Sequence, residues 1–369
     1  MLYVSPVGER GGAETVLLNL LRFQDRLHFN PIVCFLKAGP IVEEARLIVN
    51  DVFVYPTARL RNVSSLSAIR AIRRLICARR IDIVFGNMTM GHVYGGLAAV
   101  GTGARAVWFD HGVLRQPDAV DHIAARVPAA ATFATSARAS RARAAFSRKP
   151  PVQVVPAGID VDTYDSTRYE RGSIRRALGI DAIVPVVACV ARLQRWKGHS
   201  LFLQAAALIH RDCPEAHFLI AGGALFGLEE RYADELRREA RTRLPDGHVH
   251  FLGHRDDVPA VLADVDVLVH CPVEPEPFGL VVVEAMAMGV PVVSVRGSGP
   301  EEIVGHEQTG ILVAPGDAAA LSGAASALLR DPERRQAMGR AGRCRACERY
   351  SARRMVKDIE SELQRLVDR

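Results

Sequence analysis

Residues 185–223 read PVVACVARLQRWKGHSLFLQAAALIHRDCPEAHFLIAGG, and this stretch indicates the fold. Residues 185–190 form a short apolar run, and residues 200–210 carry apolar side chains at helical spacing. Residues 217–221 form a second apolar run that ends at two glycines. Short, continuously apolar runs are typical of strands buried on both faces, and a helix between two of them makes a parallel β–α–β unit. We therefore expect a parallel sheet covered by helices.

The same alternation continues on both sides of this stretch. Further strands are expected at residues 2–5, 31–36, 81–85, 106–109, 152–155, 249–252, 265–270 and 291–295. Helices are expected at residues 15–22, 65–80, 229–243, 257–263, 279–288 and 317–330, and a long charged helix is expected at about 352–367. The sequence therefore predicts an α/β protein with two Rossmann-like, doubly wound domains that face each other across a cleft.

The turn Pro156-Ala-Gly-Ile-Asp160 marks the predicted boundary between the domains. We expect residues 1–157 to form the first domain and residues 158–351 the second. Ligands of doubly wound sheets bind at the carboxyl ends of the strands. The residues that carry the chemistry are therefore expected in the turns that directly follow strands.

Composition and length exclude several classes of protein. The chain has 369 residues, of which 49% are hydrophobic and 24% charged, unlike a disordered chain, a collagen-like fibre or a disulfide-stapled mini-protein. Its longest apolar run, residues 182–191, is shorter than the about 20 residues that span a membrane. Residues 1–6 lack the basic start and apolar core of a signal peptide. We therefore expect a cytoplasmic protein.

Cysteine spacing gives no sign of a metal site. The chain has seven cysteines, and only Cys344 and Cys347 are closely spaced. No second Cys or His pair accompanies them in the sequence, so we expect free thiols rather than zinc ligands or a disulfide framework.

Positive charge is concentrated in the first part of the chain. Residues 1–157 hold 20 Lys and Arg against 10 Asp and Glu, a net charge of +10, whereas the remainder holds 27 against 31, a net charge of −4. Such a basic half can attract phosphate groups, anionic lipid or nucleic acid, or it is simply a solvated surface. Among these partners, we do not expect nucleic acid. The expected helix at 65–80 is either a lipid-facing helix or, as we favour, a core-packed helix with a solvated rim. Its basic residues are Arg70, Arg73, Arg74, Arg79 and Arg80, and its apolar ones include Ile69, Ile72, Leu75 and Ile76.

The most specific motif is Glu276-Pro-Phe-Gly-Leu-Val-Val-Val-Glu284. Pro277 keeps Glu276 extended, and a helix is expected to begin near Gly279, whose backbone N–H groups make its N-terminus an anion site. Eight residues at 1.5 Å each span roughly 12 Å, a suitable length for gripping both ends of a sugar–diphosphate–nucleoside. The alternative is a helix with one capping and one solvent-facing glutamate.

Three further turns carry candidate binding residues. Arg192 and Lys197 follow an expected strand, so that both cations can meet a phosphate, although they can also be surface charges. Gly11-Gly12 lacks the Gly-x-Gly-x-x-Gly spacing of adenine dinucleotide sites and is either an anion-binding loop or a plain turn. His111 ends another strand and either contacts a sugar hydroxyl or is structural.

Two Asp-x-Asp pairs imitate a metal-binding motif. Asp264-Val-Asp266 lies at the start of an expected strand, and Asp160-Val-Asp162 lies in the boundary turn. We interpret both pairs as structural. The sequence thus predicts no metal and no cofactor, with Arg192 and Lys197 in the place of a cation.

In combination, these motifs resemble the GT-B-fold, retaining glycosyltransferases of family four, over nearly the whole chain. The resemblance is carried by Gly11-Gly12-Ala-Glu14, His111-Gly112, Pro156-Ala-Gly-Ile-Asp160, Arg192, Lys197-Gly198, Phe251-Leu-Gly253, Glu276 to Glu284 and Gly310-Ile-Leu-Val-Ala-Pro-Gly316-Asp317. Two turns depart from the family pattern: Ala157 stands where asparagine is usual, and Gly222-Gly223-Ala224 stands where Gly-Asp-Gly is usual.

The resemblance implies a role for each matching residue. Arg192 and Lys197 would neutralise the donor diphosphate, Glu284 would bind the ribose, and Glu276 would hold the transferred sugar. The backbone amides of Phe278, Gly279 and Leu280 would complete the donor pocket.

The first domain would contribute to the same site. Gly12 would contact the diphosphate from the first domain, and His111 would touch the sugar. The last helix, about 352–369, would pack back on the first domain. The leaving phosphate would itself deprotonate the acceptor.

The predicted activity is therefore transfer of a hexose from a UDP- or GDP-sugar to a hydroxyl acceptor, in glycan, glycolipid or natural-product biosynthesis. Two alternatives remain: a nucleotide-sugar epimerase or phosphorylase of the same fold, and a non-catalytic nucleotide-sugar-binding protein. The basic first half also predicts peripheral contact with the inner face of a membrane.

Overall fold

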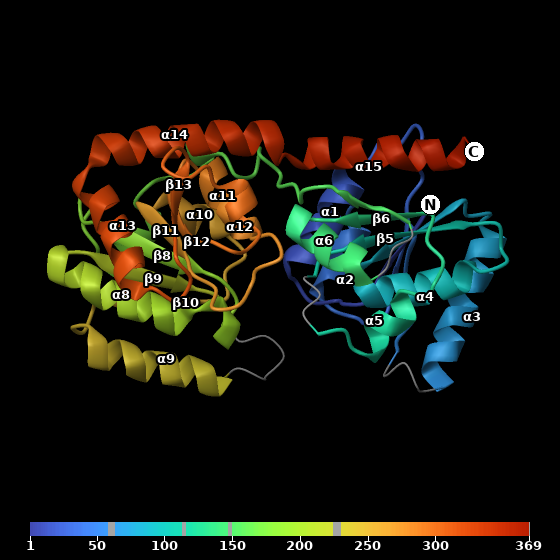
Figure 1. Ribbon diagram of the computed structural model, residues 1–369, viewed down its shortest axis with the longest axis horizontal. Helices are drawn as coiled ribbons and strands as arrows, with labels where there is room; N and C mark the ends of the chain where they lie inside the picture. The colour runs from blue at the N-terminus through green and yellow to red at the C-terminus, as the bar shows by residue number, and fades with distance from the viewer. Residues whose placement is uncertain (58–62, 113–115, 147–149, 224–229, 369) are drawn as a thin grey trace. The chain divides into compact units, whose positions relative to one another are not determined.

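The computed structural model describes residues 1–57, 63–112, 116–146, 150–223 and 230–368 (Figure 1). They form two compact units. The first consists of Met1–Ile159 together with Ala352–Arg369, and the second of Asp160–Ser351. The chain therefore leaves the first unit after Ile159 and returns to it with its last helix.

The described part of the first unit contains a seven-stranded sheet in the order β3-β2-β1-β4-β5-β6-β7, with every pairing parallel. The strands are β1 (Leu2–Ser5), β2 (Ile32–Phe35), β3 (Val52–Val54), β4 (Ile83–Asn87), β5 (Arg105–Asp110), β6 (Ala131–Ala134) and β7 (Val152–Val154). The helices are α1 (Gly12–Phe23), α2 (Pro40–Arg46), α3 (Val63–Ala78), α4 (Met88–Ala99), α5 (Ala119–Ala124), α6 (Ala137–Phe146) and α15 (Ala352–Val367). Strands β3 and β6 were absent from the sequence prediction.

The described part of the second unit contains a six-stranded parallel sheet in the order β10-β9-β8-β11-β12-β13. The strands are β8 (Val186–Val190), β9 (His217–Ala221), β10 (Val249–Gly253), β11 (Val267–His270), β12 (Val292–Val295) and β13 (Gly310–Val313). The helices are α7 (Ser173–Leu178), α8 (His199–Asp212), α9 (Glu230–Arg243), α10 (Val258–Ala263), α11 (Leu280–Ala287), α12 (Pro300–Ile303), α13 (Ala318–Arg330) and α14 (Pro332–Arg349), with short 3₁₀ helices η1 (Ser166–Arg168) and η2 (Arg195–Lys197). The predicted fold class, two Rossmann-like α/β domains, is confirmed.

Both sheets have a switch point, where the direction of winding reverses. In the first sheet, β1 pairs with β4 on one side and with β2 on the other. In the second sheet, β8 lies between β9 and β11 in the same way. Doubly wound sheets bind their ligands at the carboxyl ends of the strands beside such a point. A ligand-binding site is therefore expected in the turns after β1, β4, β8 and β11.

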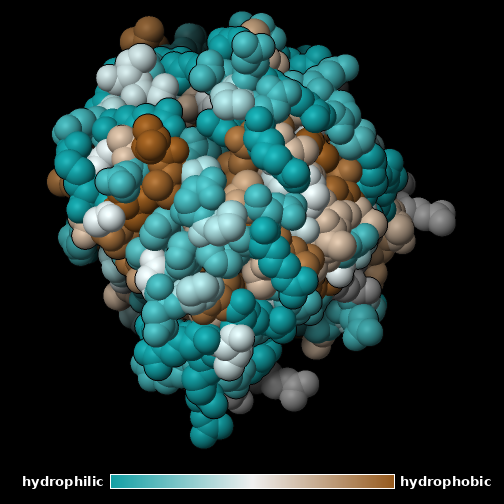
Figure 2. Space-filling view, turned by 90° about the vertical axis from the view of Figure 1, so that its left-hand side faces the viewer, coloured by the Kyte–Doolittle hydropathy of each residue, from teal (hydrophilic) through white to brown (hydrophobic). Residues whose placement is uncertain are grey.

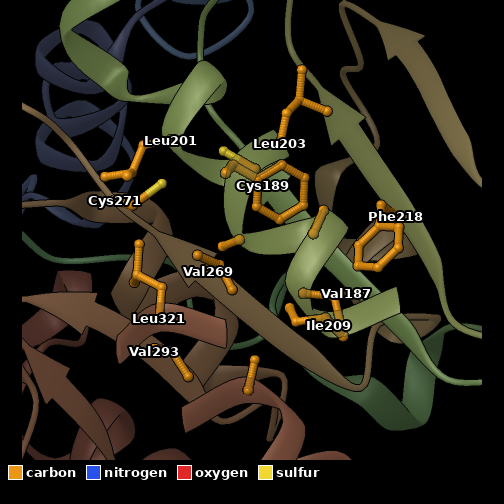
Figure 3. Close-up of a cluster of buried hydrophobic side chains, with 14 of the residues drawn as sticks. Val187, Cys189, Leu201, Leu203, Ile209, Phe218, Val269, Cys271, Val293 and Leu321 are labelled. Carbon is orange, nitrogen blue, oxygen red and sulfur yellow. The ribbon is translucent and has the colours of Figure 1, made fainter. Parts of the chain in front are cut away.

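The core of the second unit shows why the apolar runs predicted its strands. Val187 of β8, Phe218 of β9 and Val269 of β11 are fully buried, and Leu203 of α8 and Leu321 of α13 belong to the same cluster (Figure 3). On the face shown in Figure 2, hydrophobic residues form small groups among hydrophilic ones. Every residue of β8, β11 and β12 is buried, so the continuous apolar character of these strands reflects a sheet that is covered on both faces.

The last helix, α15, packs on α1 within the first unit. The guanidinium of Arg353 lies 4.8 Å from the centre of the Phe23 ring, and the backbone N–H of Asp25 donates to Glu360 Oε1 over 2.8 Å. The backbone N–H of Ala352 also donates to the carbonyl of Ile159 over 2.7 Å. These contacts attach the end of the chain to the first sheet's helical cover.

Helix α3 has a buried apolar face and an exposed basic one. Ile72, Leu75 and Ile76 are buried in the first unit's core, whereas Arg70 and Arg74 are exposed. The core-packed interpretation of this helix is therefore confirmed. Across the part of the chain that the structure describes, no helix combines the length and apolar character needed to cross a bilayer.

The carboxylates of the first Asp-x-Asp pair, Asp264 and Asp266, are both occupied by structural contacts. Asp264 Oδ2 accepts from the backbone N–H groups of Ile174, over 2.7 Å, and Arg175, over 3.1 Å, and so caps α7. Asp266 Oδ2 accepts from Arg175 Nη2 over 2.7 Å and from the Val186 N–H over 2.9 Å. This buried cluster ties α7 to β8.

The second Asp-x-Asp pair forms a local turn. Asp160 Oδ1 accepts from the backbone N–H of Asp162 over 3.1 Å, and Asp160 Oδ2 accepts from the Thr163 hydroxyl over 2.9 Å. These bonds stabilise the start of the second unit.

Buried histidines make the fold sensitive to acid. His92 is 1% exposed and its ring stacks on Trp108 with 4.6 Å between centroids. Burial lowers the pKa of His92, and likewise that of His199, to about 4. Between pH 6.5 and 4 the unfolded chain protonates these rings and the folded chain does not, so stability is retained above pH 6.5 and lost as pH falls through this window. Each ring accounts for about 3 kcal/mol.

We expect His92→Phe, which keeps the stacking on Trp108, to make the fall in melting temperature between pH 7 and pH 4.5 visibly shallower. The exposed His122 gives the control, because His122→Phe should leave the slope unchanged. Thermal melts followed by circular dichroism over this range measure both slopes. Equal slopes in wild type and His92→Phe would show that this ring does not titrate on unfolding.

Candidate functional site

Lys197 and Glu276 meet at the switch point of the second sheet. Lys197 ends η2, which follows β8, and Glu276 lies in the loop after β11. The Lys197 Nζ donates to Glu276 Oε2, and the two side chains are only 13% and 9% exposed. His270, the last residue of β11, places its Nε2 3.5 Å from the same carboxylate oxygen. A cation, a carboxylate and an imidazole are thus gathered where a ligand is expected.

The carboxyl group of Glu276 is ionised at neutral pH. Burial alone would raise its pKa, but the charge of Lys197 and the contacts with His270 and Lys197 together lower that pKa to about 2. A buried carboxylate with a fixed charge accepts hydrogen bonds from hydroxyl groups. Beside it, Lys197 offers a point charge to a phosphate.

The backbone around Gly198 positions Lys197. Gly198 has φ +80°, and a Cβ there would meet the carbonyl oxygen of Cys271 at 1.9 Å, so no other residue fits without displacing the chain. The Val273 N–H donates to the carbonyl of Trp196 over 2.9 Å. Lys197 Nζ also lies 4.0 Å from the centre of the Trp196 ring. The turn after β8 is therefore fastened to the segment after β11.

Glu276 is held by the loop that precedes α12. The Gly299 N–H donates to the backbone carbonyl of Glu276 over 2.8 Å. Gly279 adopts φ +95° at the start of α11, and Phe278 is buried with its ring 6.0 Å from that of Tyr350. The expected helix start near Gly279 is found, with Leu280 as its first residue.

Glu284 and Arg192 lie in the segments that follow β11 and β8, the same two strands whose following turns carry Glu276 and Lys197. Glu284 lies on α11 and is 9% exposed. Arg192 follows β8 by two residues and is half-buried, in a turn held by the Leu193 N–H donating to the Gly223 carbonyl over 3.1 Å. Over the described ranges, the Arg192 guanidinium makes no hydrogen bond or ion pair with the protein. Its charge is available for a ligand.

The first unit presents Gly12 and His111 at the carboxyl edge of its own sheet. Gly12 begins α1, with open space around the position of its missing Cβ. The His111 Nε2 lies 2.8 Å from Asn87 Oδ1, and the ring lies 4.3 Å from that of Phe109. Burial lowers the pKa of His111 to about 3, so the imidazole is neutral.

The turn that carries His111 is fixed by a buried ion pair. Asp110 Oδ2 accepts from Arg143 Nε over 2.7 Å, with both side chains 3% exposed, and Asp110 Oδ1 accepts from the Gly112 N–H over 3.1 Å. The Arg143 guanidinium also stacks 4.3 Å from the Trp108 ring centre. Burial raises the pKa of Asp110 despite the neighbouring charge of Arg143.

The sequence did not single out three residues that contact Glu276 or position His111: His270, Asn87 and Arg143. His270 ends an apolar run and was counted with the strand, although its place shortly before Glu276 was a usable signal. Asn87 lies two residues beyond the expected end of its strand, and Arg143 lies in an alanine- and arginine-rich segment with no distinguishing pattern. Of the departing turn Gly222-Gly223-Ala224, Ala224 lies outside the described residues.

Two family models match the chain. The model "Glycosyltransferase Family 4" matches residues 10–163, and the model "Glycosyl transferases group 1" matches residues 170–345. The second match contains Arg192, Lys197, Glu276 and Glu284, and the first contains Gly12 and His111.

Curated relatives are glycosyltransferases. A GDP-mannose-dependent monoacylated alpha-(1-6)-phosphatidylinositol monomannoside mannosyltransferase of Corynebacterium glutamicum is 31% identical over 242 residues, covering 63% of this chain and 61% of that protein. A D-inositol 3-phosphate glycosyltransferase of Corynebacterium urealyticum is 37% identical over 199 residues, covering 52% and 46%. The alignments thus span less than two thirds of the length of these relatives.

Solved structures extend the likeness to the whole chain. Anabaena HepE, in complex with UDP and glucose, is 25% identical with a TM-score of 0.86 over 98% of each chain. Sucrose-phosphate synthase of Thermosynechococcus elongatus is 21% identical with a TM-score of 0.83 over 100% of this chain and 99% of that one, which shows a shared fold. The two family models match successive parts of the chain, residues 10–163 and 170–345, and the structural neighbours with the GT-B fold align over nearly the whole chain. The chain therefore belongs to the glycosyltransferases of family four.

Proposed function

We propose that this chain moves a hexose from a UDP- or GDP-sugar to a hydroxyl group of an acceptor in glycan, glycolipid or natural-product biosynthesis. The observation that carries the proposal is the buried Lys197–Glu276 pair at the switch point of the second sheet. A cation for a diphosphate and an ionised carboxylate for sugar hydroxyls are the two groups that binding such a donor requires.

Each residue of the second unit has a separate task in this proposal. Lys197 and Arg192 stabilise the charge that develops on the departing diphosphate, which is electrostatic catalysis by groups fixed before the reaction. Glu276 holds hydroxyls of the transferred hexose, and Glu284 holds those of the ribose. The backbone N–H groups of Phe278, Gly279 and Leu280 complete the donor pocket.

In the first unit, Gly12 allows a close approach to the diphosphate, and His111 contacts a sugar hydroxyl. We further propose that the transfer retains the anomeric configuration. The bond between the anomeric carbon and the phosphate oxygen breaks, the bond to the acceptor oxygen forms on the same face, and the acceptor proton passes to the leaving phosphate. The protein's contribution is then positioning and electrostatic stabilisation.

The acceptor and the location of the protein are also proposals. The curated relatives act, by their names, on phosphatidylinositol mannoside and on inositol 3-phosphate. Together with the exposed arginines of α3, this supports a cytoplasmic enzyme that works at the inner face of a membrane on an anionic acceptor.

Donor binding and turnover test the proposed function. We expect one of a panel of UDP-, GDP-, ADP- and TDP-sugars, with GDP-mannose and UDP-glucose included, to raise the melting temperature. The same donor should release its nucleoside diphosphate when phosphatidylinositol mannoside or inositol 3-phosphate is supplied, and glycosylated acceptor should form. An epimerised sugar without acceptor would instead indicate an epimerase, and a donor that binds but is never cleaved would indicate a binding protein.

We expect transfer to proceed at its full rate in excess EDTA. In the proposed mechanism Lys197 and Arg192 supply the positive charge at the diphosphate, and the carboxylates of Asp264 and Asp266 are occupied by backbone N–H groups and Arg175. Initial rates with and without chelator measure this. Loss of activity in EDTA that only magnesium or manganese restores would refute metal independence.

A further inference from the structure

Three polar side chains form a row along the carboxyl edge of the first sheet. Ser5 ends β1, Asn87 ends β4 and His111 follows β5, and these strands are neighbours in the order β1-β4-β5. Asn87 Nδ2 lies 3.5 Å from Ser5 Oγ, and Asn87 Oδ1 lies 2.8 Å from His111 Nε2. The row therefore crosses the switch point of this sheet, between β1 and β4, where doubly wound sheets bind their ligands.

The backbone holds Asn87 in one place. Asn87 and Ser5 are fully buried. A Cβ at Gly86 would meet the Cα of His92 at 2.4 Å, so the turn from β4 is packed directly against α4. Met88 has φ +64°, a conformation that a residue with a side chain seldom adopts. Such strain persists where the surrounding structure fixes the backbone, and it is concentrated at functional sites.

The hydrogen bond from His111 decides which imidazole nitrogen carries the proton. The ring is neutral because burial lowers the pKa of His111 to about 3, and a neutral imidazole has one N–H group. Asn87 Oδ1 can only accept, so Nε2 is the donor and Nδ1 keeps its lone pair. Within the described ranges, Nδ1 of His111 has no hydrogen-bond partner in the protein.

We propose that Asn87 is a positioning residue that holds His111 in its Nε2–H tautomer, so that Nδ1 accepts a hydrogen bond from a hydroxyl group of the substrate. This inference rests on the proposed function, since a carbohydrate substrate supplies that hydroxyl. The opposite tautomer would present an N–H at Nδ1. That N–H would bind a substrate oxygen as hydrogen-bond acceptor, whereas the lone pair at Nδ1 binds a hydroxyl group as donor. Asn87 thus determines which kind of sugar oxygen His111 recognises.

The tautomer can be measured without any substrate. In the full-length chain labelled with ¹⁵N-histidine, two-bond nitrogen–proton NMR spectra distinguish a protonated from an unprotonated Nδ1, and His111→Gln identifies the His111 signals. We expect an unprotonated Nδ1 at pH 7 in the wild type. A protonated Nδ1 would overturn the proposal, whatever reaction the chain catalyses.

Two substitutions at Asn87 separate positioning from folding. Asn87→Ala should give a mixture of both tautomers, whereas Asn87→Asp keeps an accepting oxygen and should retain the Nε2–H form. Asn19→Ala is the matched control, because Asn19 is also buried and its Nδ2 donates to the Gly158 carbonyl over 2.9 Å, away from His111. It should lower the melting temperature without changing the tautomer. An unchanged tautomer in Asn87→Ala would contradict the proposal.

Steady-state kinetics test whether the tautomer of His111 affects recognition of the substrate. With the donor and acceptor found active, Asn87→Ala should lower kcat/KM about tenfold, the value of one hydrogen bond, and Asn87→Asp should recover most of the loss. If no nucleotide sugar is turned over, the proposed function fails while the NMR result still decides the role of Asn87. If turnover is normal and Asn87→Ala shows wild-type kcat/KM, the positioning role fails alone.

Discussion

Replacing Lys197 by methionine is expected to lower the rate of sugar transfer by about two to three orders of magnitude, the usual loss when one preorganised charge-stabilising group is removed. Methionine keeps the length of the side chain over the Trp196 ring but has no charge for the diphosphate. It also removes the cation that lowers the pKa of Glu276, so that carboxyl group becomes easier to protonate. Steady-state kinetics with the identified donor measure the loss.

The chain offers a clean set of comparisons for this variant. Lys357 is exposed on α15, and Lys357→Met should leave the transfer rate unchanged. Lys197→Met should also melt at a lower temperature, since the buried Glu276 carboxylate loses its lysine partner. The double variant with Glu276→Gln should recover the melting temperature but not the activity. Transfer by Lys197→Met within a few-fold of the wild-type rate would contradict the assigned role.

Replacing Arg175 by methionine is expected to reduce the free energy of unfolding by about 3–5 kcal/mol. Arg175 is 2% exposed, and its Nη2 lies 2.7 Å from Asp266 Oδ2 while its Nε donates to the Asp264 carbonyl over 3.1 Å. Without the guanidinium, the carboxylate of Asp266, 7% exposed, loses its buried partner. Urea unfolding at pH 7 measures the change.

The neighbouring Arg176 is the control for this prediction. Its guanidinium pairs with Glu170 over 2.7 Å, but the two side chains are 61% and 73% exposed. An exposed pair contributes about 0–1 kcal/mol, so Arg176→Met should be nearly neutral. Equal effects of the two substitutions would show that the cluster around Asp266 is not what ties α7 to β8.

The fold was predictable where apolar runs and helical spacing are strong, and β6 and α14 were missed because their packing depends on small residues. Strand β6 contains only Ala-Thr-Phe-Ala, which is too short and too weakly apolar to stand out. Helix α14 has no apolar stripe, because it approaches its neighbours through glycine: a Cβ at Gly339 would meet the Gly289 carbonyl oxygen at 2.0 Å. Close backbone contact of this kind leaves no periodic signal in the sequence.

The residue types of the candidate site were predictable, but their pairing was not. Lys197 and Glu276 are far apart in the sequence, and they meet because β8 and β11 are adjacent in the sheet, an order that the sequence does not state. The same holds for Asn87 and His111, which follow the adjacent strands β4 and β5. The topology rule for doubly wound sheets predicted the location of such a site. The strand order, in contrast, determines which side chains touch one another there.

The central claim is that the second unit binds a nucleoside diphosphate at the switch point of its sheet. A crystal structure of the full-length chain grown with GDP or UDP tests it most directly. We predict a diphosphate bound to Lys197 Nζ and the Arg192 guanidinium, with the ribose at Glu284. A nucleotide ordered elsewhere, with Lys197 Nζ still paired to Glu276, would contradict the claim.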